Sequence, residues 1–135
     1  MTTALATAII CTAVLAALLF LLGINVSRMR GVTAKTGGSQ FPGDPASRLL
    51  IAIRAHGNAA EYIPVLIVLF LLAGARSPAA VAIPLIIGAT AARTVHAYGL
   101  LTAPSLAVTT KARLAGAAGT YLLGVGLAVS AALSL

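Results

Sequence analysis

The sequence predicts an all-α integral membrane protein, a bundle of four transmembrane helices. Of its 135 residues, 60% are hydrophobic and 8% are charged, whereas soluble domains carry about 25% charged residues. So little polar surface cannot cover a soluble globule. The apolar residues also gather in four segments, each long enough to cross a hydrocarbon core about 30 Å thick. We expect one membrane domain over the whole chain.

Residues that favour turns separate the four expected helices. The segment 25–47 contains Gly37-Gly38 and a Pro-Gly-Asp-Pro run, so we expect a loop there. Pro78 suits the start of the third helix, and Pro104 lies in the connection that follows it. The expected helices cover residues of about 4–24, 49–73, 79–100 and 110–134.

Small residues recur at every fourth position along the last helix. They are Ala112, Gly116, Thr120, Gly124, Ala128 and Ala132. A stripe of small side chains lets two helices approach closely. We therefore expect this face to pack against another helix of the bundle or against another subunit.

Basic residues are distributed unevenly over the connecting segments. The second connection carries Arg76 alone. The first and third, with their flanks, carry Arg28, Arg30, Lys35, Arg48, Lys111 and Arg113. Four spans place both termini on one side, so the positive-inside rule predicts cytoplasmic first and third loops, with the termini outside. Loops that face an anionic leaflet also explain the net charge of +7, and without Trp we expect no nucleic-acid partner.

A polar stripe interrupts the second apolar segment. Arg54, Asn58, Glu61 and Tyr62 are spaced so that a helix places them on one face, and Glu61 is one of only two acidic residues. An unpaired charge at bilayer depth costs at least ~2.5–3.5 kcal/mol, so these groups must pair, hydrate or line a cavity. Arg54 and Glu61 lie roughly 10 Å apart along the helix axis, a span that a zwitterionic ligand could bridge.

The third segment carries Arg93, with His96 one turn later. An ion pair between Glu61 and Arg93 that joins two helices is the structural alternative to a ligand site. A lone histidine such as His96 most often makes an interhelical hydrogen bond. The sequence holds no Ser-His-Asp arrangement and no phosphate-binding loop. Two histidines without a cysteine or carboxylate cluster also predict no metal site.

Two of these runs resemble the signatures of one family. Residues 54–64, Arg-Ala-His-Gly-Asn-Ala-Ala-Glu-Tyr-Ile-Pro, resemble the MAPEG pattern Arg-x-His-x-Asn-x-x-Glu-Tyr-x-Pro. Residues 92–99, Ala-Arg-Thr-Val-His-Ala-Tyr-Gly, are similar to the family's third-helix motif, especially in bacterial members. MAPEG proteins are the membrane-associated proteins in eicosanoid and glutathione metabolism, and the resemblance covers nearly the whole chain.

The resemblance implies a homotrimer of four-helix subunits in a bacterial inner membrane. Glutathione, or another low-molecular-weight thiol, would lie in a cytoplasmic-facing cleft between subunits and react with lipophilic small molecules from the lipid. Transferred by motif position, the thiol-binding residues of one subunit would be Arg54, Asn58, Glu61 and Tyr62, with Arg28 or Arg30 near the end of the first helix. Arg93 and His96 would come from the next subunit.

Two positions depart from the family pattern. Several family enzymes carry a Tyr seven residues after the third-helix Arg, where this chain has Leu100. Their thiolate-activating Arg has no aligned counterpart near residues 103–106, and Arg113 replaces it only if this loop is longer. Arg113 is the candidate catalytic residue.

Three functions are compatible with these residues. The first is a glutathione- or other thiol-dependent transferase or peroxidase that acts on lipophilic electrophiles. The second is a non-catalytic module of the same fold that binds a lipid or another protein. The third is a small four-span multidrug transporter, which also needs one membrane carboxylate; Glu61 beside Arg54 in the second helix fits that class less well.

Overall fold

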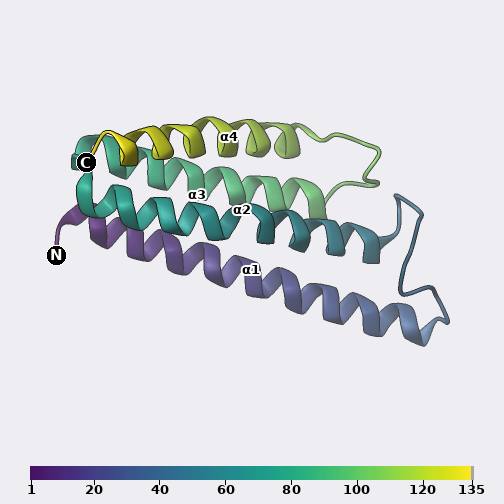
Figure 1. Cartoon of the computed structure of the whole chain (residues 1–135). Coiled ribbons are helices and arrows are strands. Elements are labelled where there is room, and N and C mark those ends of the chain that lie inside the picture. The colour runs from purple at the N-terminus through teal and green to yellow at the C-terminus, as the bar shows by residue number, and fades with distance from the viewer. Residues whose placement is uncertain (135) are drawn as a thin grey trace.

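The computed structural model, which describes residues 1–134, contains four long helices and no strand in that range. They are α1 (Thr3–Lys35), α2 (Arg48–Arg76), α3 (Ala79–Leu101) and α4 (Lys111–Ala132). All four are long and apolar enough to cross a membrane. The predicted all-α membrane bundle is confirmed. Figure 1 shows the helices side by side, with both termini at one end and the first and third connections at the other.

The first helix is longer than the sequence suggested. The expectation that it ends near residue 24 is wrong, because α1 continues to Lys35 and extends beyond the other helices in Figure 1. Its end is set by Gly37, whose φ of 69° is the left-handed conformation that glycine adopts most easily. The Gly38 amide then donates to the Thr33 carbonyl at 2.9 Å and the Gly37 amide to Ala34 at 3.1 Å, a Schellman cap.

Hydroxyl side chains cap the N-termini of three of the helices. Thr2, Ser47 and Thr110 accept hydrogen bonds from the backbone amides of Leu5, Leu50 and Arg113 respectively. These bonds satisfy amide groups that have no partner inside the helix. The cap at Thr110 matters most for the site, because it fixes Arg113 in the first turn of α4.

The helices meet where their side chains are small. A methyl group added at Gly74 of α2 would lie 2.7 Å from the Ala8 Cβ of α1. One added at Gly116 of α4 would lie 2.5 Å from the His96 backbone nitrogen of α3. The predicted stripe on α4 therefore packs against α3 at Gly116. Thr120 is also buried, whereas Ala128 is exposed.

We expect Gly116→Ala to lower the free energy of unfolding by about 1–3 kcal/mol, the usual effect of overpacking a close contact. The new methyl group would meet the His96 backbone, which cannot move without shifting α3. Thermal unfolding of the purified protein in detergent, followed by circular dichroism, measures the change.

Gly57→Ala is the matched control for this substitution. No atom lies within 4 Å of a methyl group placed at Gly57 in α2, so alanine there should stabilise the helix by roughly 0.5–1 kcal/mol. Equal losses of unfolding free energy in both variants would show that Gly116 is not needed for the close contact between α3 and α4.

Candidate functional site

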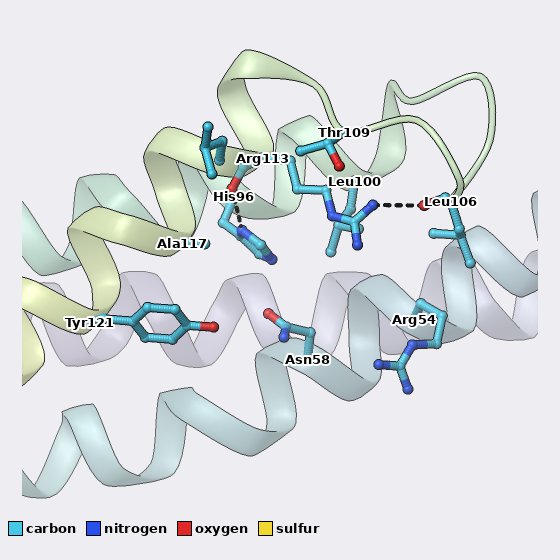
Figure 2. A pocket seen from close by; sticks show the side chains of 10 residues that line it. Arg54, Asn58, His96, Leu100, Leu106, Thr109, Arg113, Ala117 and Tyr121 are labelled. Atoms are coloured by element: carbon cyan, nitrogen blue, oxygen red, sulfur yellow. Dashed lines mark hydrogen bonds between the residues drawn. The ribbon is translucent and has the colours of Figure 1, made fainter.

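A cavity of about 340 Å³ opens between α2, α3 and α4 near the third connection. Figure 2 shows polar side chains from three helices around it. The lining residues are Arg54, Asn58, His96, Leu100, Leu106, Thr109, Arg113, Leu114, Ala117 and Tyr121. Four of the residues chosen from the sequence, Arg54, Asn58, His96 and Arg113, are therefore brought to one space.

Arg54 and Asn58 form the α2 wall of the cavity. They are one helical turn apart, so they project from the same face. The Arg54 side chain is exposed and Asn58 is half-buried. The cavity thus has a solvated cation at its mouth and an amide deeper inside.

Arg113 forms the opposite wall. Its Nη1 donates to the Leu106 carbonyl at 3.0 Å, which holds the guanidinium against the third connection. This connection is itself anchored, because the Leu106 amide donates to the Pro45 carbonyl at 2.9 Å. The loop places Arg113 across the cavity from Arg54 and Asn58, although no arginine is found at residues 103–106.

His96 is held by one hydrogen bond to α4. Its Nδ1 donates to the Arg113 carbonyl at 2.9 Å, so in the neutral ring Nε2 is free to accept a hydrogen bond. The side chain is buried, yet it still borders the cavity. The expected interhelical hydrogen bond of His96 is confirmed, and it joins α3 to the turn that carries Arg113.

Arg93 lies behind the cavity wall. It is 2% exposed, and its Nη2 donates to the Asn58 Oδ1 at 2.8 Å. Its Cζ lies 5.1 Å from the centre of the Tyr62 ring, within the range of a cation–π contact. The Nε of the same side chain is buried without a hydrogen-bond partner. Arg93 therefore orients Asn58 and Tyr62 and does not itself line the cavity.

One of these contacts changes an expectation about Arg93. It hydrogen-bonds Asn58 and not Glu61, so the structure does not support the interhelical ion pair. That Arg93 and His96 contribute to the site of the next subunit stays a prediction. Within the chain, Arg93 joins α3 to α2, and His96 joins α3 to α4. The physical reason is that α3 packs against both α2 and α4 of one chain.

Tyr121 is a site residue that the sequence reasoning missed. Its hydroxyl lies 3.4 Å from that of Tyr62, and the two ring centres are 5.8 Å apart. A phenol in the middle of the largely apolar α4 was the available signal, because a tyrosine hydroxyl away from the membrane interface usually needs a polar partner.

An apolar groove of about 310 Å³ continues from Tyr121 along α2 and α4. Its walls are Tyr62, Val65, Leu66, Leu69, Thr120, Tyr121, Gly124, Val125 and Ala128. Tyr121 borders both the polar cavity and this groove. The two spaces are therefore neighbours, one suited to a charged molecule and the other to a lipophilic one.

Three candidates from the sequence lie elsewhere. Glu61 is exposed and does not line the cavity. Arg28 donates to the Asn25 side chain at 3.1 Å and borders a different cavity, and Arg30 is exposed on the extension of α1. Leu100, which stands where several family enzymes have a tyrosine, does line the cavity.

Comparison with known families agrees with this architecture. The MAPEG family model matches residues 8–133, which include nearly all of the four helices and every side chain of the cavity. None of the curated proteins compared with the chain matches it. A match of this length, on four helices that can each span a bilayer, shows that the chain is an integral, multi-pass membrane protein of the MAPEG family.

Proposed function

We propose that this protein is a membrane-bound transferase or peroxidase that acts on lipophilic electrophiles. It either conjugates them with glutathione or another small thiol, or uses that thiol to reduce them. The observation that carries the proposal is the polar cavity holding Arg54, Asn58 and Arg113, next to an apolar groove that begins at Tyr121. A charged thiol and an oily co-substrate could then meet at that tyrosine. Membership of the MAPEG family supports this class of activity.

Each polar wall of the cavity matches one part of such a thiol. Arg54 can form paired hydrogen bonds with a carboxylate, and the Asn58 amide can bond the peptide groups of the ligand. In this proposal the Glu61 carboxylate, exposed three residues beyond Asn58 on α2, takes the ligand's amine. Arg93 supports the site indirectly by holding Asn58 in place.

Arg113 is the residue that we assign to the sulfur. A nearby guanidinium stabilises a thiolate, lowers the pKa of the ligand's thiol and so raises the fraction of nucleophile at neutral pH. The thiolate then forms a sulfur–carbon bond with the electrophile. The displaced group leaves with the bonding electrons, or a ring-opened oxygen takes a proton from water.

We further propose that the protein assembles as a homotrimer, as the resemblance implies, in a bacterial inner membrane. We also propose that the first and third connections face the cytoplasm, so that small thiols reach the cavity from that side. The positive charges on these connections support this orientation.

Glutathione added to the purified protein should produce the ultraviolet absorption band of a thiolate. The same sample should conjugate a lipophilic electrophile such as 1-chloro-2,4-dinitrobenzene, and glutathione should raise the thermal stability of the protein because it binds the folded state. S-methylglutathione, which has no ionisable thiol, is the control and should give stabilisation without the band.

The outcomes separate the two leading functions. Thiolate formation with turnover supports the enzyme. Stabilisation by glutathione without turnover of any electrophile would favour the non-catalytic binding module, to which the apolar groove and Leu100 would be suited. If glutathione and other small thiols produced neither stabilisation nor a thiolate band, the proposed thiol site would be refuted.

A further inference from the structure

Tyr121 lies where the polar cavity and the apolar groove meet, and it borders both. Figure 2 shows its hydroxyl end directed into the cavity, on the side of Asn58. A lipophilic electrophile in the groove and a thiol in the cavity would react beside this hydroxyl. Given the thiol site proposed above, on which this inference rests, we propose that the Tyr121 hydroxyl donates a hydrogen bond to the oxygen that becomes negatively charged when the thiolate opens an epoxide.

The Tyr121 hydroxyl accepts a hydrogen bond and keeps its own proton available. Tyr62 donates to it, with 3.4 Å between the two oxygen atoms. Within residues 1–134, no acceptor is found for the Tyr121 hydroxyl. A phenol can donate one hydrogen bond while it accepts another, so this O–H is free for a ligand. A hydroxyl that accepts a hydrogen bond is also polarised by it, which makes it a stronger donor.

Contacts with α2 and α3 hold Tyr121 in this position. The centre of its ring lies 5.8 Å from that of Tyr62, and the two ring planes are inclined by 48°. Tyr62 is held in turn by Arg93, whose Cζ lies 5.1 Å from the centre of the Tyr62 ring. The donor is therefore oriented before a substrate arrives, which is what stabilisation of a developing charge requires.

The same face of α4 carries the residue that we assign to the sulfur. Arg113, Ala117 and Tyr121 follow one another at intervals of four residues, and all three line the cavity. Arg113 and Tyr121 are about 12 Å apart along the helix axis. Helical side chains lean toward the N-terminus, so the Tyr121 ring extends toward Arg113. Ala117 between them has only a methyl group, which leaves space for the reacting atoms.

The reaction needs no further co-reactant. The thiolate forms a sulfur–carbon bond with one epoxide carbon, the carbon–oxygen bond breaks, and its electron pair stays on the oxygen. The Tyr121 O–H stabilises this alkoxide through a charge-assisted hydrogen bond until the alkoxide takes a proton from water. An alkyl chloride is attacked at carbon in the same way, but its charge leaves on chloride. The site should therefore favour epoxides over alkyl chlorides.

Styrene oxide and benzyl chloride are suitable probes, because a thiolate can attack a benzylic carbon in both and only the epoxide leaves its charge on oxygen. The kcat/KM of each is measured with glutathione and the purified protein in detergent. Tyr121→Phe should lower the ratio of the styrene oxide value to the benzyl chloride value roughly 10–100-fold, the effect of losing one hydrogen bond to a charged group. Tyr98→Phe is the matched control and should keep the ratio, because Tyr98 is exposed and borders neither space.

The thiolate band separates failure of this role from failure of the thiol site. An unchanged ratio in a folded Tyr121→Phe variant that still shows the band would overturn the role of Tyr121 alone. Neither a band nor turnover of either probe by the wild-type protein would refute the thiol site, and the role of Tyr121 with it.

A comparison on the wild-type protein applies even if Tyr121→Phe does not fold. Relative to the uncatalysed reactions with glutathione, styrene oxide should be accelerated roughly tenfold more than benzyl chloride, because only its transition state gains the hydrogen bond. Equal accelerations of the two probes would overturn the proposal.

Discussion

Replacing Arg113 with glutamine is expected to lower the kcat of conjugation about 100-fold, the effect of losing a cation that shifts a thiol pKa by roughly two units. The guanidinium lies on the wall of the cavity and is held by the Leu106 carbonyl, so it is fixed before the ligand arrives. Without it, less of the bound thiol is ionised at neutral pH. The rate should therefore recover at higher pH, where the thiol ionises without help.

Three measurements on the Arg113→Gln variant test this role together. They are the kcat at neutral pH, the pH profile of the rate and the thiolate absorption band. The band should weaken while binding of S-methylglutathione changes little. Lys111→Gln is the matched control, because Lys111 is exposed in the same first turn of α4 and does not line the cavity. A folded Arg113→Gln variant with a full thiolate band would assign the activation of sulfur to another group.

Helical periodicity predicts the candidate site only where a single helix carries it. Arg54 and Asn58 share a face of α2 because of helical periodicity, which is a local property. The approach of Arg113 and Tyr121 could not be predicted in the same way. It depends on the path of the third connection and on the rotation of α4 about its axis, and both are set by contacts between helices, such as Gly116 against His96.

The helix boundaries, too, could be predicted from the sequence only in part. The apolar spans are visible in the sequence, because the bilayer requires runs of about 20 apolar residues. The polar extension of α1 to Lys35 is not, because polar residues and the glycines at 37 and 38 indicate a loop over the entire 25–47 segment. Glycine ends a helix at its own position, and residues 25–35 before it can remain helical outside the lipid.

The buried charge of Arg93 is expected to lower the stability of the protein while it orients Asn58 and Tyr62. The side chain is 2% exposed, its main partner is a neutral amide, and its Nε has no partner. Burying a charge under these conditions is unfavourable, and replacing buried charges with apolar side chains of similar size is often stabilising. The apolar environment of α3 within a membrane makes the burial more costly still.

We therefore expect Arg93→Met to affect stability and binding in opposite directions. The free energy of unfolding should rise by about 1–3 kcal/mol, because the buried guanidinium is removed. The Asn58 amide that loses its partner borders the cavity, where water can replace the lost hydrogen bond. Glutathione should bind roughly tenfold more weakly, because Asn58 and Tyr62 are no longer held in place, and that preorganisation contributes to affinity.

Thermal unfolding without ligand and a glutathione titration on the same sample measure both effects of Arg93→Met. Thr94→Val, at the next residue on the exposed side of α3, is the control and should change neither by more than about 0.5 kcal/mol. A large loss of stability in Arg93→Met would mean that the Asn58 and Tyr62 contacts outweigh the burial of the charge. A gain in stability with unchanged glutathione binding would instead show that Arg93 does not position the binding site.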